Sequence, residues 1–113
     1  MVLRNGKISY VQQTNNLDIF LTQNAILLDV RTIQEYARTK IPAARHIALE
    51  DLPNLLEQIK SWNAPIIPYS NYGDKSRIAT ELLEQANIKV MDGGAKNELS
   101  KLLQKKEAAL QLN

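Results

Sequence analysis

The sequence contains no cysteine, which excludes disulfides, thiolate metal ligands and any reaction that uses a cysteine nucleophile. It has one histidine, His46, and no second metal ligand stands at a useful spacing from it, so we expect no metal site. Glycine and proline are also scarce, at 4 residues each, while 44% of the residues are hydrophobic. This composition is typical of an ordinary globular chain and excludes a fibrous or disordered one.

Long apolar segments and a strong charge imbalance are missing as well. No run approaches the length of a membrane-spanning helix, and the first ten residues lack the apolar stretch of a signal peptide. The chain has 14 Lys and Arg against 12 Asp and Glu, and the net charge of +2 does not favour a polyanionic partner. We therefore expect no membrane or nucleic-acid partner, a monomer, and a cytoplasmic location, although a processed periplasmic form would look the same.

The sequence does contain an alternation of short apolar runs with helical patterns. The runs at residues 25–30, 65–69 and 88–91 predict strands, and the first is apolar on both faces, as a strand inside a parallel sheet would be. We expect one α/β domain over residues 1–113, with a parallel sheet of about five strands and helices on both of its faces. Its motif-bearing core covers about 25–94, and a final helix covers about 95–110.

Two short motifs predict where the first helices begin. Asn15 and Asn16 are expected to cap a short helix that precedes the first strand. Thr32 and Glu35 have the capping-box spacing, and they predict a helix that ends at about Arg38.

Later in the chain, proline and asparagine provide similar signals. Residues 52–59 have the apolar spacing of an amphipathic helix, in which Pro53 is tolerable because it falls in the first turn. Asn87 suits the left-handed end of the helix that precedes it. Pro68 does not suit the strand expected at residues 65–69, because it lies inside that strand and cannot donate a hydrogen bond to a neighbouring one.

The segment from Ser70 to Ser76 is the candidate functional loop. It follows the expected strand at residues 65–69 and leads into a helix, the place where ligands bind in open α/β sheets. Gly73 permits a turn in which successive N–H groups converge, and the helix N-terminus adds a field that favours an anion. Lys75 could attract an anion, whereas Asp74 opposes it. The candidate anion-binding residues are Asn71, Tyr72, Gly73, Asp74, Lys75, Ser76 and Arg31.

Four motifs in order resemble those of the rhodanese-like sulfurtransferases, in particular the short single-domain members. They are LLDVR at 27–31, KIPAARHI at 40–47, YSNYGDKS at 69–76 and MDGG at 91–94. The resemblance implies a rhodanese-like α/β fold and a loop of pattern C-x-x-G-x-x-[ST], in which Ser70 stands at the position of the catalytic cysteine. It also implies that Asp29 and Arg31 form a pair that orders the loops around the site, with Arg31 either contacting substrate or purely structural.

The resemblance implies a reaction that Ser70 cannot perform. Family enzymes take sulfane sulfur from thiosulfate onto the cysteine as a persulfide and pass it to cyanide or a thiol acceptor, without a cofactor. A serine hydroxyl forms no persulfide and needs a general base to attack anything. We therefore expect an inactive domain that retains an anion-binding loop for a small sulfur-containing anion or another oxyanion and acts as a binding or regulatory module, with a protein partner left open.

Two other interpretations are kept. The chain is alternatively a genuine thiosulfate sulfurtransferase whose cysteine was changed to Ser70 for study. A serine-based hydrolase or phosphatase is the third, and it lacks an evident base. The family's G-H-I-P-G-A reads TKIPAA here, with Thr39, Lys40 and Ala43 in place of glycine, histidine and glycine. Such erosion fits relaxed selection on catalysis better than a single laboratory substitution.

Overall fold

In a computed structural model, residues 10–111 of the chain are described. These residues form a parallel four-stranded sheet in the order β2-β1-β3-β4. The strands are β1 (Ile26–Asp29), β2 (Arg45–His46), β3 (Ile66–Ser70) and β4 (Gly94–Ala95). The expected α/β class is confirmed, with four strands in place of about five.

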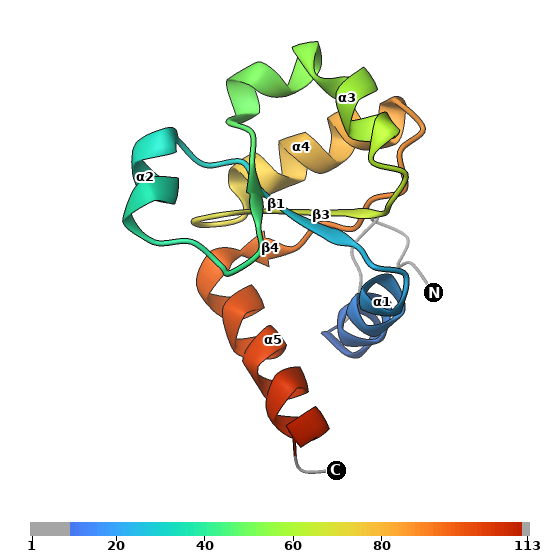
Figure 1. The fold of residues 1–113 in the computed structure, drawn as a ribbon, viewed down its shortest axis with the longest axis vertical. Helices are drawn as coiled ribbons and strands as arrows, with labels where there is room; N and C mark the ends of the chain where they lie inside the picture. Colours follow the sequence, from blue (N-terminus) through green and yellow to red (C-terminus); the bar gives the residue numbers. More distant parts are fainter. Residues whose placement is uncertain (1–9, 112–113) are drawn as a thin grey trace.

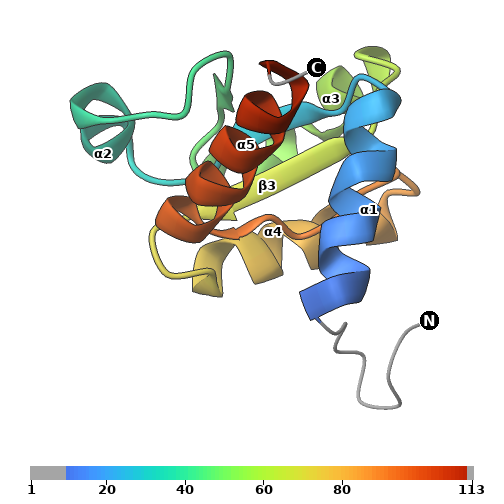
Figure 2. The same ribbon diagram turned by 90° about the horizontal axis from the view of Figure 1, so that it is seen from below.

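Helices cover both faces of the sheet, as Figures 1 and 2 show. On one face lie α1 (Tyr10–Thr22) and α5 (Lys96–Gln111), and on the other lie α3 (Leu56–Ser61), α4 (Asp74–Gln85) and the 3₁₀ helix η1 (Leu49–Asn54). The short helix α2 (Ile33–Arg38) stands apart, beyond the carboxyl ends of the strands. Among the helices within residues 10–111, none has both the length and the apolar character needed to cross a membrane.

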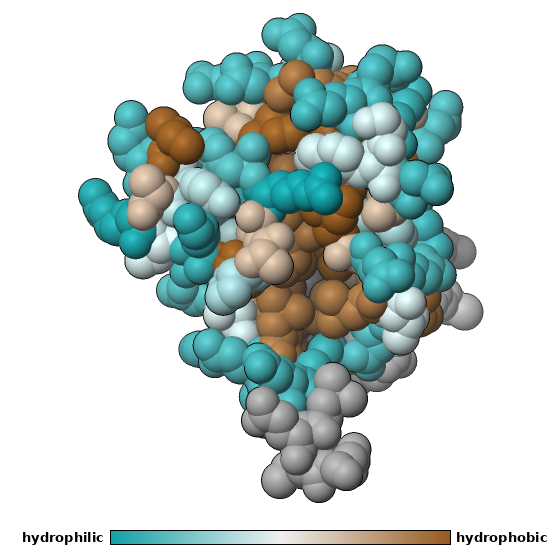
Figure 3. All heavy atoms as spheres, viewed as in Figure 1, coloured by the Kyte–Doolittle hydropathy of each residue, from teal (hydrophilic) through white to brown (hydrophobic). Residues whose placement is uncertain are grey.

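Two apolar clusters hold the layers together. The cluster on the α3 and α4 side is built around Leu28, Leu52, Ile66 and Leu83, and the cluster on the α1 and α5 side around Leu17, Ile67 and Leu99. Figure 3 shows apolar residues gathered between α1 and α5 on one face of the molecule. Because the strands alternate their side chains between these clusters, the sheet is buried on both faces, as the apolar runs predicted.

The predicted helix boundaries are partly confirmed. Thr32 and Glu35 form a capping box at the start of α2, and Asn87, which follows the C-cap Ala86 of α4, has φ 62°. The prediction for Asn15 and Asn16 is wrong, because α1 runs through both of them from Tyr10. A helix that packs its apolar face on the sheet overrides the preference of asparagine for a cap position.

The single helix predicted for residues 52–59 is in fact two segments. The 3₁₀ helix η1 contains Pro53 and ends at Asn54, and α3 begins at Leu56. Between them Leu55 has φ −120° and ψ 12°, outside helical values, and its N–H donates to Leu52 O in the tighter 3₁₀ pattern. Because the helical segment begins at Leu49, Pro53 falls beyond its first turn, where it has no N–H to donate to Leu49 O, and this fits the 3₁₀ form of η1.

Pro68 explains why the strand predicted at residues 88–91 is missing. On the side of β3 that faces this segment, Ile66 donates to Lys89 O and accepts from Met91 N–H, and Val90 forms an isolated bridge with it. The next residue of β3 on this side is Pro68, which has no N–H to continue the ladder. Regular pairing resumes only in β4, where Gly94 pairs with Tyr69.

Candidate functional site

The loop predicted to carry the function lies at the carboxyl edge of the sheet, between the end of β3 and the start of α4 (Figure 1). The neighbouring strand β1 ends at Asp29 on the same edge, because Asp29 pairs in register with Tyr69. The parallel sheet therefore brings the segment after β1, which includes Arg31, close to the loop.

Ser70 is buried at the base of this loop, with 1% of its surface exposed. Its Oγ accepts hydrogen bonds from two backbone N–H groups, those of Gly73 and Ser76, each at 3.1 Å. The loop thus wraps around the side-chain oxygen of Ser70. Its two N–H groups point at this atom and would stabilise a negative charge there.

Gly73 makes this wrapping feasible. It has φ 89°, a left-handed value that costs glycine little, and it is the N-cap of the 12-residue helix α4. The hydroxyl of Ser76 donates back to Gly73 O at 3.1 Å and closes the turn. Because Ser76 is in the first turn of α4, its N–H carries the partial positive charge of a helix N-terminus.

A buried ion pair supports the loop from β1. Arg31 Nη2 lies 2.7 Å from Asp29 Oδ2, and both residues are almost fully buried. The hydrogen bond to Asp29 raises the pKa of Arg31. Since a buried charge is costly unless it is paired, the two residues fix one another in place.

Arg31 also holds the first residue of the loop. Its Nη1 donates to Asn71 Oδ1 at 3.1 Å, and the Asn71 amide donates to the carboxylate of Glu35. Glu35 belongs to the capping box, and the hydrogen bond from Thr32 N–H is the main cause that lowers the pKa of Glu35. A network of hydrogen-bonded side chains therefore joins β1, the loop and α2. Its members are Asp29, Arg31, Asn71 and Glu35.

The other predicted loop residues are more exposed. Tyr72 is 89% exposed at the tip of the loop, and Asp74 is exposed at the first position of α4. Lys75 is half-buried, and its charge contributes to the lowered pKa of Glu35. The structure thus brings Ser70, Gly73, Ser76, Asn71 and Arg31 together, whereas Tyr72 and Asp74 face solvent.

His46 lies in β2 and is engaged away from Ser70. Its Nε2 is 2.8 Å from Arg31 O, and its ring stacks on Tyr36 with 4.7 Å between ring centres. Within residues 10–111, the hydrogen bonds made by Ser70 Oγ are the two that it accepts from the loop. This geometry offers no general base to activate the hydroxyl, which argues against a serine hydrolase.

Two residues that shape the site were not predicted from the sequence. Glu35 was assigned only to a helix cap, yet it also binds Asn71. Tyr69 is fully buried beneath the loop, where its hydroxyl accepts from Ile41 N–H at 3.3 Å, and burial raises its pKa. An aromatic residue at the end of an apolar strand was the only signal available for Tyr69, and it does not identify the partner.

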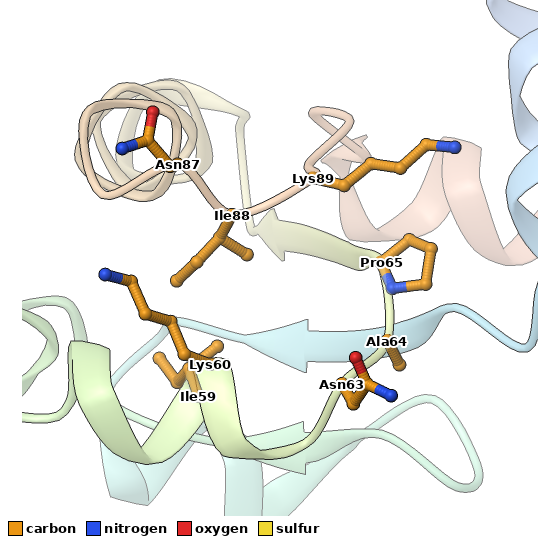
Figure 4. Close-up of a pocket in the computed structure, with 8 residues that line it drawn as sticks. All are labelled: Ile59, Lys60, Asn63, Ala64, Pro65, Asn87, Ile88 and Lys89. Atoms are coloured by element: carbon orange, nitrogen blue, oxygen red, sulfur yellow. The ribbon is translucent and has the colours of Figure 1, made fainter.

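Two cavities of about 270 Å³ each lie at opposite ends of the sheet. One adjoins the loop and is lined by Val30, Arg31, Thr32, Ala48, Leu49, Glu50 and Lys75. The other, in Figure 4, is lined by Ile59, Lys60, Asn63, Ala64, Pro65, Asn87, Ile88 and Lys89. In Figure 4, Lys89 points away from the other lining side chains, and its Nζ donates to Gln23.

A family model matches most of this chain. The chain belongs to the rhodanese-like domain family, whose model matches residues 14–101. Among curated proteins, none matches the chain.

Solved structures resemble the chain as well. A protein from Staphylococcus saprophyticus has a TM-score of 0.62 and 26% identity, covering 76% of this chain and 88% of its own. A rhodanese-like domain protein from Staphylococcus aureus has a TM-score of 0.54 and 28% identity, covering 72% and 82%. The human single-domain sulfurtransferase has a TM-score of 0.57 at 22% identity, covering 77% and 92%, and at that identity it shows the fold alone.

Proposed function

We propose that this protein is a single-domain rhodanese homologue that performs no sulfur transfer and uses its loop to bind a small anion as a binding or regulatory module. The observation that carries the proposal is the position of Ser70 Oγ, which receives the N–H groups of Gly73 and Ser76 where a family enzyme has its sulfur. The serine preserves the shape of the cradle but supplies no atom that can hold a sulfane sulfur.

The surroundings of the loop support an anion as the ligand. The N-terminus of α4 and the half-buried Lys75 both favour negative charge there. Arg31 has a different part in the proposal, because its contacts with Asp29 and Asn71 suit it to position the loop. A small sulfur-containing anion or another oxyanion is the class of ligand that this arrangement favours, and we propose a cytoplasmic setting for it.

Titration with sulfate, phosphate and thiosulfate tests the anion site. Backbone amide shifts that move first and most at residues 70–76 are the expected result. Lys75→Met should weaken binding, whereas Lys101→Met, a change at an exposed lysine on α5, should not. If amides at residues 70–76 stay unmoved at millimolar anion while the protein remains folded, the anion-binding proposal fails.

The second candidate is a sulfurtransferase that lacks only its nucleophile, and the intact cradle favours it. A thiosulfate-to-cyanide assay on the protein and on Ser70→Cys, side by side, separates the two. Turnover by the cysteine variant alone would support a working scaffold in which serine has replaced cysteine. If neither form turns over but both are folded, the site has changed beyond one residue, and the binding module is the better description.

A further inference from the structure

The cavity beside the loop has walls that are held in place before any ligand arrives. Leu49 N–H donates to Val30 O at 3.1 Å, which fixes the start of η1 against the end of β1. On the other side, Arg31 is tied to Asp29, and Thr32 belongs to the capping box of α2. A cavity with fixed walls loses little conformational entropy when it is filled.

The size of the cavity suits a molecule smaller than a drug. Its volume is about 270 Å³, below the roughly 300–1,000 Å³ of typical ligand pockets. Val30, Ala48 and Leu49 give it an apolar part, in which Val30 is fully buried and the other two are half-buried. A short aliphatic group is therefore the part of a ligand that fits this wall.

Charged side chains of both signs line the same cavity. Lys75 contributes a cation from the first turn of α4, and Glu50 contributes an anion from the first turn of η1. Among the ion pairs of the described residues, none joins these two side chains. Each can therefore form an ion pair with a charge of the opposite sign on a ligand.

We propose that this cavity binds a small zwitterion of the amino-acid type with a short aliphatic side chain. Its carboxylate pairs with Lys75, its ammonium group pairs with Glu50, and its side chain packs against Val30 and Leu49. The site goes beyond the anion cradle, because Ser70 does not line it and its ligand is organic and carries both charges.

The cavity in Figure 4 provides an internal comparison. It has the same volume and contains two lysines, Lys60 and Lys89, but its lining includes no acidic residue. Lys60 is already paired with Glu57 at 3.2 Å, and Lys89 donates to Gln23 at 2.7 Å. Of these two cavities, the one beside the loop is therefore the one that combines both charges with an apolar wall.

Three matched probes test the proposal by backbone amide shifts of the whole chain. L-leucine carries both charges, 4-methylpentanoate lacks the amine, and 3-methylbutylamine lacks the carboxylate. We expect L-leucine to move the amides of Thr32 and Leu49, and each single-charge probe to bind about fivefold or more weakly. Lys75→Met and Glu50→Gln should each weaken the binding of L-leucine by a similar factor. Lys60→Met and Glu57→Gln should leave its affinity unchanged.

Several outcomes would overturn the proposal. L-leucine could move none of these amides at 10 mM, or move only those of Lys60 and Ile88 at the far cavity. The acid could bind as tightly as L-leucine and resist Glu50→Gln, which would assign the cavity to plain anions. Lys75 serves both sites, whereas Glu50 lines only this cavity, so Glu50→Gln should weaken binding of L-leucine and leave the sulfate shifts at Gly73 and Ser76 unchanged. Because Glu50 is exposed, Glu50→Gln keeps the test valid even if Lys75→Met does not fold.

Discussion

The hydroxyl oxygen of Ser70 lies 3.1 Å from the amide nitrogen of Ser76, although six positions separate them in the sequence. This contact exists because the loop between them turns at Gly73 and delivers the N-terminus of α4 to the end of β3. The same N–H group would face any atom placed at position 70. The chemistry of that position can therefore be changed without rebuilding the loop.

A cysteine introduced at position 70 should be acidic. In Ser70→Cys the N–H groups of Gly73 and Ser76 would stabilise the thiolate, so its pKa should lie below the about 8.5 of a free thiol. Because the sequence contains no cysteine, this thiol would be unique, and its thiolate absorbance against pH measures the pKa directly. Ser61→Cys is the control, because Ser61 is exposed at the last residue of α3. Equal pKa values in the two variants would contradict a cradle that stabilises charge.

Asn71 and Glu35 should be energetically coupled. Their contact joins the loop to α2, and its partners are 36 residues apart in the sequence. A double-mutant cycle with Asn71→Ala and Glu35→Ala should give a coupling of about 0.5–1 kcal/mol in the free energy of unfolding by urea. Glu35→Ala also removes the capping box, but it does so both with and without Asn71→Ala, so this loss of stability cancels in the cycle.

The control cycle combines Asn71→Ala with Glu57→Ala, a change at an exposed residue of α3. Those two changes should add within experimental error. Equal coupling in both cycles would mean that Asn71 and Glu35 do not interact in solution.

The capping box should weaken in acid. The pKa of Glu35 is lowered in the folded protein, mainly by the hydrogen bond from Thr32 N–H. The unfolded chain therefore binds this proton more readily, so the stabilisation is present above the ordinary glutamate pKa of about 4.3 and is lost as the pH falls through the lowered value. The difference in unfolding free energy between the protein and Glu35→Gln should shrink over that range. A difference that stays constant with pH would exclude this assignment.

Ala43 should be a source of strain that glycine relieves. It has φ 70°, a left-handed value that favours glycine. Ala43→Gly should raise the free energy of unfolding by about 1 kcal/mol, because an L-residue is disfavoured by roughly that amount in this region.

Two matched variants control this result. Gly94→Ala, at φ 74° with open space around its Cβ position, should show the opposite change of similar size. Ala37→Gly, inside α2, should destabilise by up to about 1 kcal/mol through helix propensity alone. A destabilising effect of Ala43→Gly would mean that the left-handed conformation is not retained in solution.

Local sequence signals predicted the parts of this fold that depend on neighbouring residues. The capping box of Thr32 and Glu35, the left-handed Asn87 and the buried strand β1 all follow from contacts or preferences within a few positions. The loop at Ser70 was located because an apolar strand ends there and a glycine follows three residues later.

Contacts between distant segments account for the rest. The bond from Arg31 to Asn71 spans 40 positions, so a single sequence carries no local signal for it. The prediction of a strand at residues 88–91 was wrong for a similar reason. Its apolar residues were recognised, but the effect of Pro68 depends on which side of β3 this segment occupies, and only the tertiary arrangement fixes that side.

The hydrogen bond that Pro68 cannot donate makes the boundary between β3 and residues 90–95 the more weakly bonded edge of β3. Four residue pairs join β1 to β3, whereas residues 90–95 are joined to β3 by two pairs in β4, an isolated bridge at Val90 and the hydrogen bond from Gly93 N–H to Pro68 O. In native-state hydrogen exchange, we expect the amides of residues 94–103 to exchange through a partial opening with a lower free energy than global unfolding, while those of β1 and β3 remain protected until the whole chain opens. Because Tyr69 and Ser70 pair with β4, this opening would expose to solvent one side of the base of the loop around Ser70.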